Sequence, residues 1–65
     1  MMMAMQGEDL KQLRKQAGMT QAELAGAIGM TATSIGLMER GAAPIEKRTE
    51  LAVRYIVEAA TARRV

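Results

Sequence analysis

Residues 20–41 read TQAELAGAIGMTATSIGLMERG, and this stretch predicts two short helices joined by a tight glycine turn. Thr20 and Glu23 have the spacing of a capping box, in which the threonine hydroxyl accepts a backbone N–H and the glutamate side chain reaches back. Gly29 stands where a helix needs a left-handed end, and glycine adopts that conformation without a steric penalty at Cβ. Thr31 can then cap the second helix.

The apolar residues of this stretch recur at helical spacing, which predicts one inward face on each helix. They are Leu24, Ala25, Ile28, Ile35 and Met38. Ala25 is expected where the two helices cross, because helices joined by so short a turn nearly touch and a bulky side chain would hold them apart. Gly41 is expected to end the second helix.

Two further helices are expected around this stretch, over residues 8–17 before it and from residue 46 to about 62 after it. In the first of them Leu10, Leu13 and Ala17 share one face, as in a helix that packs on a core. No alternating strand pattern is present. The predicted fold class is therefore all-α, a compact four-helix domain that contains a helix-turn-helix.

The first seven residues, MMMAMQG, are expected to form a disordered segment in front of a folded domain over residues 8–65. Four of the first five residues are methionine, so whether residues 1–5 are native is left open. The segment carries no lysine or arginine, and we do not expect it to contact DNA.

The chain resembles the helix-turn-helix proteins of the phage repressor and Cro type, also called XRE-like. The matching segments are LKQLRKQAGMTQAELAGAIGM, TSI and MERG, with Pro44 and Ile45 just beyond, so that the resemblance runs from Leu10 to roughly Tyr55. It implies a lambda-repressor-like DNA-binding domain, in which the second helix of the motif lies in the major groove with its N-terminal residues at base edges.

The resemblance also implies which residues contact DNA. Gln21 matches the family's phosphate-contacting glutamine, and the backbone amides at that helix start would add to the contact. Base-facing residues on the reading helix, residues 31–40, would be Thr31, Ala32, Thr33, Ser34, Gly36 and Leu37. Arg40, Lys47 and Arg48 are candidates for phosphate contact, with a solvated basic surface as the alternative.

Arg14 and Glu39 match a family pair that forms an ion bridge between the first helix and the reading helix. The alternative is two unrelated surface charges. A partly buried bridge fixes geometry more surely than it adds stability, because desolvation offsets the Coulomb gain.

The reading helix departs from the family's pattern, because no residue between Ala25 and Met38 is charged. Family members often carry Gln, Arg or Lys at the base-facing positions, where each bidentate contact gives about 1–3 kcal/mol of discrimination. Base recognition here would depend on threonine and serine hydroxyls, on apolar contact with thymine methyl groups and on DNA shape. A protein-interaction module, anti-activator or antitoxin-like, with Leu37 as the anchor, is the alternative function, and its binding would depend little on salt.

The composition narrows the remaining function classes. The 65 residues make one domain of net charge +2, without histidine or cysteine, so disulfides, a zinc site and the usual catalytic groups are missing. We expect no enzyme, no catalytic residues, no metal or other cofactor and no small-molecule ligand. The longest uncharged run has 15 residues, whereas a membrane span needs about 20 apolar ones, so no membrane partner is expected.

The last helix carries a wider apolar stripe than the core of so small a domain needs. The surplus predicts a homodimer, with an interface formed by Leu51, Tyr55, Ile56 and Ala59. The predicted function is a cytoplasmic, nucleoid-associated repressor that binds double-stranded DNA. Two reading helices about 34 Å apart would contact a short, near-palindromic operator.

Overall fold

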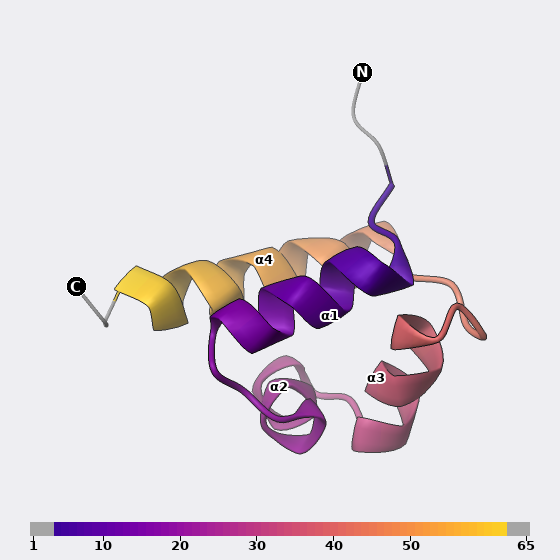
Figure 1. Cartoon of the computed structure of the whole chain (residues 1–65), viewed down its shortest axis with the longest axis horizontal. Coiled ribbons are helices and arrows are strands. Elements are labelled where there is room, and N and C mark those ends of the chain that lie inside the picture. Colours follow the sequence, from indigo (N-terminus) through magenta and orange to yellow (C-terminus); the bar gives the residue numbers. More distant parts are fainter. Residues whose placement is uncertain (1–3, 63–65) are drawn as a thin grey trace.

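The computed structural model describes residues 4–62, which form α1 (Gly7–Gln16), α2 (Gln21–Ile28), α3 (Ala32–Glu39) and α4 (Lys47–Ala62). In Figure 1, α1 and α4 run alongside each other on one side of the domain, and α2 and α3 lie on the other side. No residue of this described part is in a strand. The prediction of an all-α, four-helix domain is confirmed.

Local capping explains where α2 begins and ends and where α3 begins. Thr20 Oγ1 accepts the backbone N–H of Glu23 at 3.0 Å, and the Glu23 carboxylate accepts the backbone N–H of Thr20 at 2.8 Å. Gly29 ends α2 in the left-handed region, with φ of 74°. Thr31 Oγ1 then accepts the N–H of Ser34 at 3.1 Å and so caps α3. The whole connection is thus specified by neighbouring residues.

The core receives one fully buried side chain from each helix, namely Leu10, Leu24, Ile35 and Val53. Met38 and Val57 extend this cluster, and Ala25 is buried in it. The most extensive helix contact is that of α2 with α3, as their short connection requires. None of the helices between residues 4 and 62 is long and apolar enough to cross a membrane.

The expectation of a disordered segment over residues 1–7 is wrong for its last three residues, whereas residues 1–3 lie outside the described part. Met5 is 5% exposed and belongs to the core, and the Gln6 backbone N–H donates to Asp9 Oδ2 at 2.9 Å at the start of α1. Gly7 is already in α1, one residue earlier than expected. A Cβ built on Gly7 would lie 2.5 Å from the carbonyl oxygen of Met38 and 2.6 Å from that of Glu39.

Packing divides the apolar residues of α4 into a buried and an exposed set. Val53 and Val57 are buried, whereas Leu51 and Tyr55 are 55% and 73% exposed. The side chain of Glu50 is buried as well, and its carboxylate accepts from Arg54 Nε at 3.1 Å. Lys47 Nζ lies 3.9 Å from the same carboxylate. Arg54 stands four residues after Glu50 and Lys47 three residues before it, and these helical spacings were the sequence signals for the ion pairs.

Candidate nucleic-acid interface

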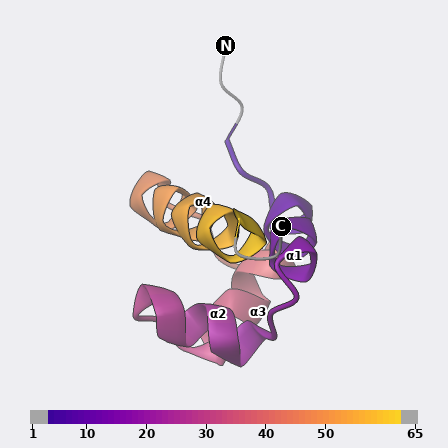
Figure 2. The same cartoon turned by 90° about the vertical axis from the view of Figure 1, so that its left-hand side faces the viewer.

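Two of the residues expected to contact bases, Thr33 and Leu37, lie on the outer face of α3. Ile35 and Met38 point into the core, and successive residues are turned by about 100°. Thr33, Leu37 and Arg40 therefore lie on the opposite side, where Thr33 and Arg40 are exposed and Leu37 is half-buried. In Figures 1 and 2, α3 lies together with α2 on the side of the domain away from α4.

Gly36 is buried in spite of its place on the outer half of α3, because two side chains cover it. A Cβ built on Gly36 would lie 3.3 Å from Arg40 Nη1 and 3.6–3.7 Å from the amide atoms of Gln21. The missing side chain thus leaves room for Arg40 and Gln21 to lie close to the helix. Sequence reasoning did not identify this role, and the i, i+4 spacing of Gly36 and Arg40 was the only local signal for it.

A side-chain network connects Gln21, at the start of α2, to α1 and to the end of α3. Arg14 Nε and Nη2 donate to the two carboxylate oxygens of Glu39, at 2.6 and 3.1 Å. Arg14 Nη1 donates to the carbonyl oxygen of Met19 at 3.0 Å, and Gln21 Nε2 donates to Glu39 Oε1 at 3.0 Å. The side chains of Arg14 and Glu39 are only 12% and 5% exposed. The network therefore fixes Gln21 relative to α1 and α3.

The environment favours the charged form of both partners of this ion pair. Burial alone would raise the pKa of Glu39, but hydrogen bonds from Arg14 and then Gln21, together with the charges of Arg14 and Lys11, lower it on balance. The hydrogen bond to Glu39 raises the pKa of Arg14 above its ordinary value, against the effect of burial. The pair is therefore ionised at neutral pH.

The hydroxyl groups expected to contact bases are not equivalent. The Thr31 hydroxyl accepts the N–H of Ser34 and donates to Ser34 Oγ at 3.0 Å, so both hydroxyls take part in the cap of α3. Ser34 lies toward a shallow groove with Leu37 and Pro44. Thr33 Oγ1 has no hydrogen-bond partner within the described range 4–62, and Ala32 is half-buried. Thr33 is thus the hydroxyl most available to an outside partner.

The three basic residues expected beside phosphate differ in their surroundings. Arg40 is exposed on the outer face of α3 and forms no ion pair with any residue of the described part. Lys47 lies next to the buried Glu50, and Arg48 Nε donates to Glu46 at 3.1 Å. Glu46 and Glu50 therefore partly neutralise the positive charge at the start of α4, and Arg40 provides the unpaired charge nearest the reading face.

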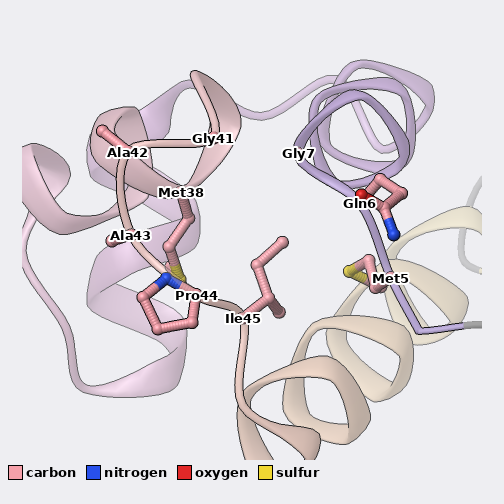
Figure 3. A pocket seen from close by; sticks show the side chains of 9 residues that line it. All are labelled: Met5, Gln6, Gly7, Met38, Gly41, Ala42, Ala43, Pro44 and Ile45. Atoms are coloured by element: carbon pink, nitrogen blue, oxygen red, sulfur yellow. The ribbon is translucent and has the colours of Figure 1, made fainter.

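An apolar hollow lies between the start of α1 and the loop over residues 41–45 (Figure 3). The side chains of Met5, Met38 and Ile45 point toward it, and no charged residue lines it. Nowhere in residues 4–62 do three or more acidic residues gather closely enough to hold a metal ion.

The four residues expected at a dimer interface differ in how far they are exposed. Leu51 and Tyr55 are on the side opposite the buried Val53. Ile56 is half-buried and packs on the core, and with Ala59 it lines a shallow hollow that also includes Met19 and Ala27. The homodimer interface expected at these four residues stays a prediction; Leu51, Tyr55 and Ala59 follow one another at i, i+4 and i+8 along one side of α4.

Comparison with known proteins gives one family match. A family model described as a helix-turn-helix domain matches residues 7–64, and this family lies within the XRE/Cro-like group. No curated protein and no solved structure matched the chain.

Proposed function

Because this chain belongs to the helix-turn-helix domain family, we propose that it is a transcriptional regulator that binds a specific DNA sequence through α3. The observation that carries the proposal is the grouping of Gln21, Thr33 and Arg40 around the exposed face of α3. The ion pair of Arg14 with Glu39 holds this group against the body of the domain. In the corresponding docking mode the first helix of the motif crosses the DNA backbone and the second lies in the major groove.

Phosphate contacts are assigned to Gln21, Arg40 and the first backbone amides of α2. The Gln21 amide has two N–H donors, of which one serves Glu39 and the other is left for a phosphate oxygen. The N-terminus of a helix favours such an anion because its unpaired N–H groups point toward the anion and the positive end of the helix dipole lies there. Lys47 contributes a weaker contact, since it shares its charge with Glu50, and Arg48, on the side of α4 opposite Val53, is not assigned one.

Base contacts are assigned mainly to Thr33 and Leu37. The free hydroxyl of Thr33 can donate to or accept from a base edge, and Leu37 and Ala32 can contact the methyl group of thymine. The hydroxyls of Thr31 and Ser34 serve the helix cap first. We therefore expect half-sites with thymine at the contacted positions. We expect the protein to bind these sites with moderately higher affinity than other DNA sequences.

Repression is the proposed mode of action, because occupying a DNA site is sufficient to block transcription and needs only the surface described above. We also propose that the active form is a homodimer joined through α4. A near-palindromic operator requires two reading faces that point the same way, about 34 Å apart. The side of α4 that joins the two copies therefore decides whether the dimer reads one near-palindromic site or holds two separate duplexes.

The test is selection from a random duplex library at two salt concentrations, with Thr33→Val and Arg40→Ala as variants and Lys15→Ala as the control. Lys15 is exposed on α1, so its variant loses the same charge as Arg40→Ala at a different place. We expect one short motif, altered base preference in Thr33→Val, and a salt slope reduced by about 1 in Arg40→Ala. Retention without a motif, unchanged by Arg40→Ala, would contradict sequence reading and favour a protein partner instead.

A further inference from the structure

The outer side of α4 presents four exposed residues in a self-complementary order. Arg48, Leu51, Tyr55 and Glu58 fall within an arc of about 80° on the side opposite Val53 and Val57. Along the helix they read as a positive charge, two large apolar side chains and a negative charge. We call these four residues the outer stripe.

The charges at the two ends of the outer stripe are available to a partner. Glu58 forms no ion pair with any residue in the described range 4–62. Arg48 is bound to Glu46, but its side chain is 88% exposed, and such a surface pair contributes little and exchanges readily. The neighbouring cations Lys47 and Arg54 are already held by Glu50.

The apolar centre of the outer stripe is the second observation. Leu51 and Tyr55 are the large hydrophobic residues that stand exposed in the described part of the chain, and they are adjacent on the helix at i and i+4. Ala52, Ala59 and Ala62 lie beside them along α4, and their short side chains allow a second helix to approach closely.

We infer that the outer stripe binds the outer stripe of a second copy of this chain, with the two α4 helices antiparallel. Arg48 and Glu58 lie five residues on either side of Val53, and Leu51 and Tyr55 lie two residues on either side. A two-fold axis can cross the outer side of α4 at the level of Val53, perpendicular to the helix. It then places Arg48 opposite Glu58 of the second copy and Leu51 opposite its Tyr55. A parallel pair would bring like charges together. Because the stripe is narrow, the pairing is weak and depends on concentration.

This pairing has a consequence for DNA, which rests on the function proposed above. In Figures 1 and 2, α4 lies at the top of the domain and α3 at its bottom, and helix contacts join each of them to both α1 and α2 through the core. The outer face of α3 points away from the buried Ile35, and the outer stripe points away from the buried Val53, so the two surfaces lie on different sides of the domain. A two-fold axis that lies in the interface turns one reading face away from the other. The dimer then holds two separate duplex segments, as in bridging or looping, and not two neighbouring half-sites of one duplex.

The test of the pairing is sedimentation equilibrium without DNA, over a concentration series, on the wild type, Arg48→Glu, Glu58→Arg and the double variant. Each single change puts like charges opposite one another, and the double change restores opposite charges. We expect the wild type and the double variant to dimerise and each single variant to dimerise at least tenfold more weakly. Thermal melting checks that all four are folded. Four equal association constants, or four monomers at every concentration, would overturn the inference.

The DNA consequence has its own measurement, the co-capture of two differently labelled duplexes that carry the selected site. We expect the wild type to capture both duplexes. We expect Glu58→Arg to bind each duplex without joining them, because residue 58 is near the end of α4 and far from the residues assigned to DNA contact. Equal bridging by Glu58→Arg would overturn the back-to-back arrangement. If no duplex is bound at all, the proposed DNA-binding function fails, and the sedimentation series alone decides the pairing.

Discussion

The guanidinium of Arg14 donates two hydrogen bonds to the carboxylate of Glu39, which joins α1 to the last residue of α3. The same carboxylate accepts from Gln21 at the start of α2. One buried charge pair thus sets the relative position of the three helices that form the proposed DNA-binding surface.

Replacing Glu39 with alanine should reduce stability and DNA affinity together. The change leaves Arg14 largely buried without its counter-ion, which costs about 3 kcal/mol in comparable pairs, and it frees Gln21 to turn away from α3. Urea unfolding and a DNA titration measure the two effects. Glu46→Ala, which removes an exposed carboxylate paired only with Arg48, is the control and should change stability little. Unchanged DNA affinity in a folded Glu39→Ala variant would show that the network does not position Gln21.

The same pair predicts how stability depends on pH. The pKa of Glu39 is lower in the folded protein than in the unfolded chain, where it is about 4.3. The contribution of Glu39 to the free energy of unfolding is therefore fully present above the unfolded pKa and is lost as the pH falls through the folded pKa. We expect urea midpoints to fall as the pH drops below about 5, with a shallower slope in Glu39→Gln. Parallel slopes in the two proteins would assign the acid sensitivity to other carboxylates.

Replacing Gly36 with alanine should separate stability from DNA binding. Alanine in mid-helix is favoured over glycine by about 1 kcal/mol, so the free energy of unfolding should rise or stay the same. The new Cβ, 3.3 Å from Arg40 Nη1, should move the guanidinium and weaken DNA binding. Gly26→Ala is the matched control, because Gly26 is also helical and a Cβ there meets nothing within 4 Å. The prediction fails if both variants bind DNA as tightly as the wild type does.

Replacing Gly7 with alanine should destabilise the fold. Its Cβ would overlap the carbonyl oxygens of Met38 and Glu39, which are backbone atoms and cannot swing aside. Overpacking of this kind costs about 1–3 kcal/mol, measured as a lower midpoint in urea or on heating. Gly26→Ala again serves as the control and should not lower the midpoint. A Gly7→Ala variant as stable as the wild type would mean that α1 can shift away from α3 without loss.

The features that the sequence by itself determined are the local ones. The cap at Thr20, the left-handed turn at Gly29 and the cap at Thr31 depend on backbone groups within three or four residues, so a short window contains the whole interaction. The inward faces of α2 and α3 followed from helical periodicity in the same way.

Only the tertiary structure decided the features that depend on distant segments. Met5 is buried and Gly7 must be glycine because the start of α1 meets the end of α3, some thirty residues later in the chain. The cover of Gly36 by Gln21 similarly depends on how α2 crosses α3. The apolar pattern of α4 was ambiguous because its residues extend around the helix. Packing on α1 and α2 buried Val53 and Val57, and it left Leu51 and Tyr55 on the outer side.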